Sequence, residues 1–307
     1  MKDNIDKNWK ELLRTNNQTV FSSYVHVSND SQNTLFEYVN DSGYEEDVRV
    51  LILTQEGKLA MPYKNYHLGL GETIRIDMRK WLDEVNLHSF MGSLMVLHRH
   101  SNPPEGLKPI RSMMSYWISK DFSTQVGSSG YMALNVRGKK EKQSFFMFCP
   151  SVISTNNYKT TIAIFNHSTE PEYNDEVTLY PRLNDEEGTS IIGGPFKIAP
   201  FGLSVLDIEK HFGKDILKTN KRYSITISHV GHVLGPLFFH VSRSSGDIIS
   251  GRHTQPAAGI FKPIQGFYPN LVRSFLPFLA DGAISLAKLI LRRKPKPIEN
   301  IKETVMD

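Results

Sequence analysis

The feature that most constrains this chain is an internal repeat, in which three blocks of the middle part recur in the same order about 120 to 130 residues later. Residues 36–42 and 162–168 each read as a strand that ends in Asn and a turn. Residues 66–82 and 196–212 each read as a strand that leads through an Asp into one helical turn. Residues 116–120 and 239–243 each place an aromatic pair before a hydroxyl and a cation. The period exceeds that of solenoid repeats, so it predicts duplication of a whole domain.

Residue alternation gives the class of that domain. Apolar and polar residues alternate with a period of two in 73–78 and 223–228, which is typical of half-buried strands. Apolar runs such as 48–53 and 234–241 read as inner strands, and turn residues such as 55–57 and 185–188 separate them. We therefore predict an all-β fold of two tandem antiparallel β-sandwich units, with a short N-terminal helix and a C-terminal amphipathic helix.

The predicted division of the chain follows from the repeat and its flanks. We expect an N-terminal helical segment at 1–17, a first sandwich at 18–143, a second sandwich at 144–265, and an amphipathic helix with a basic tail at 266–307. In the first pair of blocks, each strand ends in an Asn-x-Ser turn. An acidic turn and a strand follow in each copy, and those at 45–50 are expected to match 174–179. Asp77 and Asp207 are expected to cap their helical turns.

Composition excludes several classes of protein. The chain has 307 residues, of which 39% are hydrophobic and 22% charged, as in ordinary globular proteins. Its formal charge of +4 is too small for a nucleic-acid-binding face, so we expect no nucleic-acid partner. The one cysteine, Cys149, excludes an intramolecular disulfide and a cysteine-based zinc site. We expect Cys149 to be an inert buried thiol.

The two ends indicate location. The N-terminus lacks an unbroken apolar run, so we expect a cytoplasmic protein, and Trp9, Leu12 and Leu13 are spaced as in a short amphipathic helix. Residues 271–291 are strongly apolar with one polar stripe, and basic residues follow at 292–297. This helix either packs on protein, in its own domain or in a homo-oligomer, or lies on an anionic membrane surface. The residues expected to serve membrane attachment or assembly are Phe275, Leu279, Leu286, Lys288, Arg292, Arg293 and Lys294.

The second unit also carries a resemblance. It has a strand ending at Asn166, an acidic turn that leads to Val177, a strand into Asp207, and a Gly-Pro strand that ends near Arg243. In these features it resembles the small β-sandwich of the sensory rhodopsin transducer family. That resemblance implies an oligomeric, non-enzymatic module that relays signals or binds small ligands, and it implies no catalytic residues.

Histidines are the first candidates for chemistry, because signatures for phosphate loops, zinc proteases and nucleophile elbows are absent from the sequence. His98 and His100 share one face of a strand, a spacing that can supply two metal ligands, but we see no carboxylate near them in the sequence. The second unit holds a denser set, namely His229, His232, His240 and His253 with Asp247. His240 falls where the first unit has Trp117, which favours a half-buried, hydrogen-bonded ring over a metal or general-base role.

Aromatic residues beside Ser- and Gly-rich loops are the second candidates, since such surfaces bind polar ligands or sugars, although core packing is the alternative. The loops after the aromatic strand of each unit are where we expect a ligand. The ligand-binding residues so predicted are Tyr116, Trp117, Phe122, Tyr131, His240, Arg243, Asp247 and His253.

These observations predict a non-catalytic binding or scaffold protein that recognises a protein or a polar small molecule through edge loops. We expect no catalytic residues, no metal and no cofactor. The alternative is a metal-dependent hydrolase that uses the histidines of the second unit.

Overall fold

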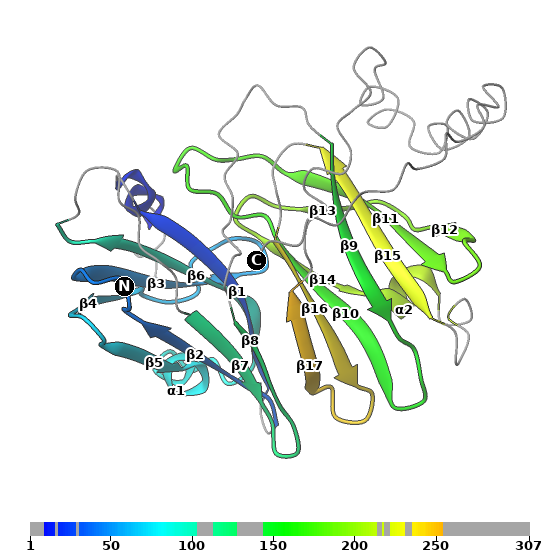
Figure 1. Cartoon of the computed structure of the whole chain (residues 1–307), viewed down its shortest axis with the longest axis horizontal. Coiled ribbons are helices and arrows are strands. Elements are labelled where there is room, and N and C mark those ends of the chain that lie inside the picture. The colour runs from blue at the N-terminus through cyan, green and yellow to red at the C-terminus, as the bar shows by residue number, and fades with distance from the viewer. Residues whose placement is uncertain are drawn as a thin grey trace, which may run out of the picture. The chain divides into compact units, whose positions relative to one another are not determined.

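A computed structural model describes residues 9–15, 18–28, 31–102, 113–127, 144–213, 217, 222–230 and 235–253. Within this part of the chain the structure is mostly β-strand, and all paired strands run antiparallel (Figure 1). The strands form four sheets, two in each half. The prediction of an all-β fold with two tandem sandwiches is confirmed. The predicted C-terminal helix lies outside the described residues.

The first module contains strands β1 to β8 and helix α1. Their bounds are β1 (Thr19–Val27), β2 (Asn33–Val39), β3 (Glu46–Thr54), β4 (Lys64–Leu68), β5 (Thr73–Asp77), α1 (Met78–Asp83), β6 (Phe90–His100), β7 (Met113–Ile118) and β8 (Ser123–Gly127). One sheet has the order β1-β6-β3-β4 and the other β5-β2-β7-β8.

The second module contains strands β9 to β17 and helix α2. Their bounds are β9 (Ser144–Val152), β10 (Tyr158–Phe165), β11 (Val177–Asp185), β12 (Ser190–Ile192), β13 (Phe196–Ile198), β14 (Leu203–Asp207), α2 (Ile208–Phe212), β15 (Tyr223–Val230), β16 (Gly235–Ser242) and β17 (Ile248–His253). One sheet has the order β14-β10-β16-β17, and the other β12-β11-β15-β9 with β13 also paired to β11.

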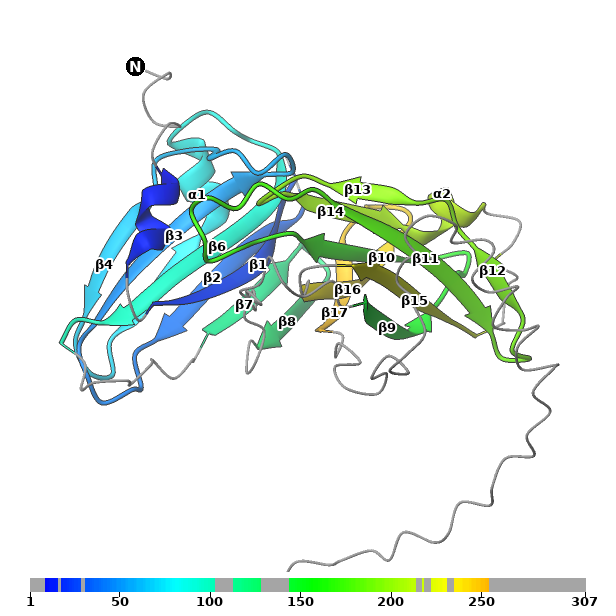
Figure 2. The ribbon, with the colours of Figure 1, turned by 90° about the horizontal axis from the view of Figure 1, so that it is seen from above.

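The two modules share one topology. Strands β1 to β8 correspond in order to β9, β10, β11, β13, β14, β15, β16 and β17, and α1 corresponds to α2 (Figure 2). Among the described strands only β12 has no counterpart, because it forms an extra hairpin with the end of β11. The repeat read from the sequence is therefore a duplicated sandwich.

Two asparagines fix the same loops in the two modules. Asn40 and Asn166 are both fully buried, and each side-chain amide donates hydrogen bonds to backbone carbonyls of two loops. The acceptors are the carbonyl oxygens of Tyr44, Leu68 and Gly69 for Asn40, and of Asp175, Ile198 and Ala199 for Asn166. The Asn-ended strands seen in the sequence are thus anchors for the loops that close one end of each sandwich.

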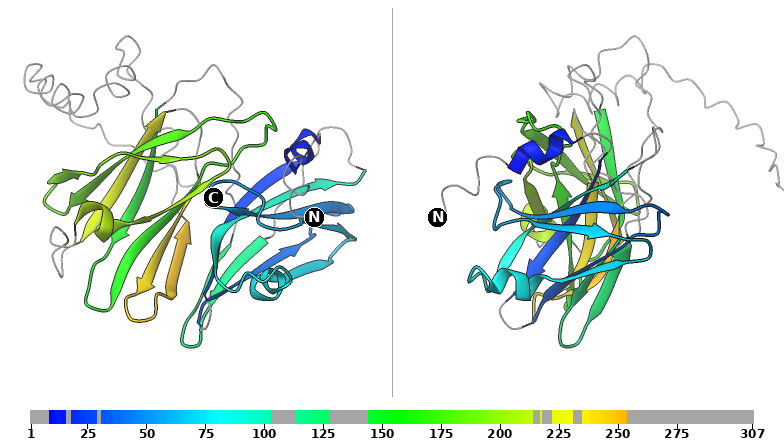
Figure 3. Two further views of the ribbon diagram at one scale, coloured as in Figure 1. Left: turned by 180° about the vertical axis from the view of Figure 1, so that it is seen from behind. Right: turned by 90° about the vertical axis from the view of Figure 1, so that its left-hand side faces the viewer.

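The helical turns are capped as predicted. Asp77 accepts a hydrogen bond from the amide of Lys80 at the start of α1, and Asp207 accepts from the amides of Glu209 and Lys210 at the start of α2. Both helices follow the edge strand of a sheet directly (Figure 3). The caps also align the modules, because Leu35 pairs with Asp77 and Thr161 with Asp207 in the same register.

One predicted match is wrong by two residues. Glu46 pairs with Leu68, whereas Val177 pairs with Ile198, and Leu68 and Ile198 are the equivalent acceptors of Asn40 and Asn166. Glu46 therefore corresponds to Val177, not to Asp175. Side chains in a strand repeat every two residues, so a shift of two preserves the pattern of faces and the sequence does not reveal it.

Each sandwich has its own apolar core. Val50, Ile52 and Val96 lie between the sheets of the first module, and Leu179 and Ile225 lie between those of the second, all without exposure to solvent. Cys149 belongs to the second core, and burial raises the pKa of its thiol. The buried, protonated thiol agrees with the expectation of an inert cysteine.

Further apolar clusters join the described parts of the two modules. The outer face of the sheet β14-β10-β16-β17, which we call the docking face, packs on residues of the first module that we call the seam. The docking face comprises Ala163, Phe165, Leu203, Leu237, Phe239, Val241 and Ile248, and the seam comprises Tyr24, Trp117 and Val126. The Phe239 ring lies 4.9 Å from the Trp117 ring and 5.3 Å from the Tyr24 ring, measured between centroids.

A second contact involves the N-terminal segment. The described part of the predicted helix is a 3-10 helix, Trp9–Arg14, which buries Trp9 and Leu13. The Trp9 ring meets the Phe201 ring of the second module edge to face at 5.0 Å. Among the described helices, none has the length and apolar character needed to span a membrane.

The asparagine anchors yield the first prediction. Replacing Asn40 or Asn166 by Ala removes a buried donor and leaves its carbonyl acceptors without that partner, so each change should lower the free energy of unfolding by about 2–4 kcal/mol. Asn65, exposed on β4, is the matched control, and Asn65→Ala should change it by less than about 0.5 kcal/mol. Urea unfolding measures both. Equal, small effects at Asn40 and Asn65 would contradict the anchor role.

Candidate functional site

The duplicated fold allows each predicted site residue to be compared with its equivalent in the other module. Thr34 pairs with Trp117 between β2 and β7, and Thr160 pairs with His240 between β10 and β16. The Trp117 indole N–H donates to the carbonyl of Tyr24 at 3.2 Å, and His240 Nε2 donates to that of Ser151 at 3.1 Å. His240 is half-buried and its ring repeats the hydrogen bond of the indole, as the sequence predicted.

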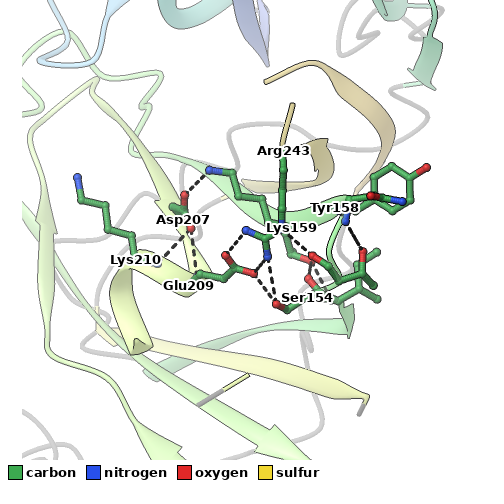
Figure 4. A network of polar contacts seen from close by, with 11 residues as sticks. Ser154, Tyr158, Lys159, Asp207, Glu209, Lys210 and Arg243 are labelled. Carbon is green, nitrogen blue, oxygen red and sulfur yellow. Dashed lines mark hydrogen bonds and ion pairs between the residues drawn. The ribbon is translucent and has the colours of Figure 1, made fainter. Parts of the chain in front are cut away.

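Arg243 belongs to a polar network at one end of the second module (Figure 4). Its guanidinium donates to both carboxylate oxygens of Glu209, the first residue after the start of α2, and its Nε donates to the carbonyl of Thr155 at 2.6 Å. Glu209 also accepts from the hydroxyl of Ser154, and Lys159 pairs with Asp207 at 2.7 Å. The network ties α2 to β10 and to the turn after β16.

The electrostatics of this network favour its charged form. Burial alone would raise the pKa values of Asp207 and Glu209, but the hydrogen bonds from Lys159 to Asp207 and from Arg243 to Glu209 outweigh it and lower both pKa values. The first module differs at the corresponding position. There Arg79 replaces Glu209 and donates directly to the carbonyls of Ser28 and Gln32. Arg243 is therefore committed to an internal ion pair.

Asp247 lies where the second module meets the first. Asp247 is 3% exposed. Burial lowers the pKa of His26 on β1, and the charge of Asp247 offsets this only in part. Next to it, the amide of Ile248 donates to the side-chain oxygen of Gln32 at 2.6 Å. Trp117 and Asp247 are thus both placed in the contact between modules.

Tyr116 and Phe122 have a different environment. Phe122 lies in the β7–β8 turn and is 36% exposed, while Tyr116 is half-buried on the outer face of the sheet β5-β2-β7-β8. Tyr116 pairs with Leu35 as Phe239 pairs with Thr161, so Tyr116 is the equivalent of Phe239. The first module therefore carries its own copy of the docking face.

This copy, which we call the open face, is apolar along β7 and half-exposed. It comprises Leu35, Val39, Met114, Tyr116 and Ile118, none of which belongs to the buried clusters of the described residues. Beside it, Arg75 donates to Glu37 at 2.7 Å across β5 and β2. In the docking face the equivalents of Glu37 and Arg75 are Ala163 and Val205. The ion pair is thus present only where the face is open.

The sequence singles out His98 and His100, but not the buried polar cluster of the first module that they form with Tyr38 and Glu46. All are 0–3% exposed and project between the sheets. Tyr38 donates to Glu46 and lies 2.9 Å from His98 Nδ1, and His100 Nε2 lies 3.8 Å from the other oxygen of Glu46. The expectation that no carboxylate lies near His98 and His100 is wrong, because β3 pairs with β6 and sets Glu46 opposite His100.

Burial disfavours the charged forms of Glu46 and Tyr38 in this cluster. Burial raises the pKa of Glu46, partly offset by hydrogen bonds from Tyr38 and Ser42 and by His100, and burial also raises the pKa of Tyr38. Within the described part of the chain, one carboxylate oxygen of Glu46 and both ring nitrogens of His100 have no hydrogen-bond partner. The second module has the apolar residues Ile164 and Val177 at the positions of Tyr38 and Glu46.

His167, also missed, links the modules. Its Nδ1 lies 2.6 Å from the hydroxyl of Ser22 and its Nε2 lies 3.0 Å from that of Ser93, both in the first module. The ring is 2% exposed, and burial lowers its pKa to about 3, with only partial compensation by a backbone hydrogen bond to Phe201. A neutral imidazole without solvent access and bonded at both nitrogens acts as a structural bridge.

The remaining predicted residues are not placed. Tyr131, Phe275, Leu279, Leu286, Lys288, Arg292, Arg293 and Lys294 lie outside the described residues, as do His232 and the side chains of His229 and His253. In the part of the chain that is described, no three His, Cys, Asp or Glu side chains come together as a metal site.

Comparisons with known proteins yield little. No protein-family model and no curated protein matches this chain. Among solved structures it is similar to a glycosyl hydrolase family 2 member from Bacteroides cellulosilyticus, with 6% identity over 77% of this chain and 28% of that chain and a TM-score of 0.21. It is also similar to Bacteroides uniformis beta-glucuronidase (8% identity, 80% and 27%, TM-score 0.17) and to an anti-sigma factor domain-containing protein (11% identity, 80% and 88%, TM-score 0.17). The chain spans less than a third of the two Bacteroides enzymes, and likenesses this weak support no functional conclusion.

The buried His167 yields a prediction of pH dependence. Its pKa in the folded protein, about 3, lies below the unfolded value of 6.5, so its contribution to stability is present above pH 6.5 and is lost as the pH falls from there towards 3. The loss approaches about 1.4 kcal/mol per pH unit. Urea unfolding between pH 7.5 and 5.0 should show a clearly shallower slope for His167→Gln than for the unaltered protein.

His88, which is 68% exposed in its side chain, provides the control for this measurement. His88→Gln should keep the slope of the unaltered protein. An unchanged slope in His167→Gln would show that the imidazole is not held neutral at the contact between modules.

Proposed function

We propose that this protein is a non-catalytic binding or scaffold protein, and that the open face with the β7–β8 turn is its recognition surface. The observation that supports this most is the equivalence of Tyr116 and Phe239. The same sheet face occurs twice in the molecule, and in the second module it is buried against protein. In the first module it is half-exposed and retains an apolar β7.

The chemistry of the open face favours a protein over a small polar ligand. Met and Tyr are enriched at the centres of protein interfaces, whereas small-molecule sites are concave, and this face is the outer surface of a sheet. The docking face binds an apolar surface that carries Tyr24 and Trp117. By that precedent, the partner presents an apolar, aromatic surface of the same kind to Tyr116.

The polar residues beside the open face are typical of an interface that forms and dissociates. The pair of Glu37 and Arg75 keeps the β5 side of the face solvated, where the permanently buried docking face has Ala163 and Val205. Interfaces that form and dissociate have an apolar centre and a polar rim. A scaffold role of this kind also accords with the resemblance of the second unit to the sensory rhodopsin transducer family, which we retain as part of the proposal.

Site-specific photocrosslinking tests this function. A photoreactive benzoylphenylalanine at position 116, in cells that naturally produce the protein, should give one dominant covalent adduct with another protein. The same group at Ile192, which is 45% exposed on β12, should not give it. The purified adduct partner should then bind the unaltered protein, and Tyr116→Asp should weaken that binding at least about tenfold.

Ile192→Asp is the control for Tyr116→Asp and should leave the affinity for the adduct partner unchanged. No adduct at position 116, or the same adduct at both positions, would contradict recognition through the open face.

A further inference from the structure

The buried polar cluster places ionisable side chains at positions where the fold does not require them. Buried ionisable groups are costly unless they are paired and hydrogen-bonded. The second module shows that the same sandwich closes with Ile164 and Val177 in place of Tyr38 and Glu46. The first module instead buries a carboxylate, a phenol and two imidazoles, so a role beyond packing is indicated.

Counting protons shows what the cluster tolerates. With one proton shared among Glu46, His98 and His100, the net charge is zero, either as a neutral acid with neutral rings or as one ion pair. The phenol of Tyr38 has a single proton, so when it donates to Glu46 the ring of His98 donates to the phenol oxygen. A second proton makes the cluster net positive, and no carboxylate other than Glu46 is buried beside it in the described part of the chain.

The groups facing the cluster come from every element around it. Tyr38 projects from β2, Glu46 from β3, and His98 and His100 from β6, while Leu68 of β4 stands opposite Glu46. Asp41, exposed in the loop after β2, acts on Glu46 from outside. The other charged neighbours point away from the core, where His67 and Arg99 pair with Asp47 and Glu45 on the outer face of the sheet.

Two loops lie over the cluster, and an aromatic ring of one of them contacts His100. The Tyr44 ring lies 5.1 Å from the His100 ring and is 38% exposed. Loops 41–45 and 69–72 are both fastened to Asn40, through the carbonyls of Tyr44 and Gly69. In the second module the equivalent loops each bury one aromatic ring, Tyr173 or Phe201, in the cluster with Trp9. In the first module Tyr44 and Leu70 of these loops are exposed instead.

We propose that the buried polar cluster is an acid-sensitive latch, in which entry of a second proton opens loops 41–45 and 69–72. Hydration of the charged imidazoles then replaces their burial. Opening exposes the buried part of Tyr44, which is 38% exposed in the structure, and so changes the surface at this end of the first module. The latch is independent of the open face, because it acts on loops β2–β3 and β4–β5 rather than on β7.

Hydrogen exchange followed by mass spectrometry tests the latch. In the full chain at pH 5.0, loops 41–45 and 69–72 should be about tenfold less protected than at pH 7.5, after correction for the intrinsic exchange rate. The turn at 119–122 should not change. His100→Phe keeps a ring against Tyr44 but takes up no proton, so its loops should stay protected at pH 5.0.

Two further variants complete the test. Glu46→Gln removes the compensating carboxylate, so opening should begin at higher pH than in the unaltered protein, and this expectation holds even if His100→Phe fails to fold. His88→Gln, which removes an exposed histidine elsewhere, should open like the unaltered protein. Equal protection at both pH values, or acid opening that persists in His100→Phe, would overturn the proposal.

Discussion

The contact between Phe239 and the rings of Tyr24 and Trp117 is the interaction on which the rest of this structure depends. Each sandwich has its own core, but a large apolar patch on the outer face of a sheet favours association with another surface. Burying the docking face on the seam solves this for the second module, and it fixes His167 between Ser22 and Ser93. The contact also makes the two copies of the module unequal, because one copy buries this sheet face and the other does not.

That asymmetry distinguishes residues that serve the fold from those that do not. Features present in both modules are part of the construction, such as the asparagine anchors, the aspartate caps and the ring-to-carbonyl hydrogen bond of Trp117 and His240. Features found in one module need another explanation. The open face around Tyr116 and the buried polar cluster around Glu46 are of this second kind. Both lie in the first module. In the second module the equivalent of the open face is buried, and the positions of Tyr38 and Glu46 hold the apolar residues Ile164 and Val177.

Much of the construction could be predicted from the sequence, because it depends on local patterns. The strand that ends at Asn166, the cap at Asp207 and the equivalence of His240 with Trp117 are visible in short blocks. The site was harder, because it depends on which strands pair. Glu46 and His100 are far apart in sequence and meet only through the register of β3 with β6. Likewise, no local signal separates Tyr116, left half-exposed, from Trp117 beside it, which is fully buried.

The central claim is that two equivalent faces have opposite environments, and paired substitutions of Phe239 and Tyr116 measure this directly. Phe239→Asp places a charge in a buried contact and should lower the free energy of unfolding by about 4 kcal/mol or more. Tyr116→Asp, on the open face, should lower it by less than about 1 kcal/mol. Denaturant unfolding of the two variants under identical conditions gives the comparison. A large difference supports one docked and one open copy of the same face, whereas equal losses would show that Tyr116 is as covered as Phe239 and would contradict the account.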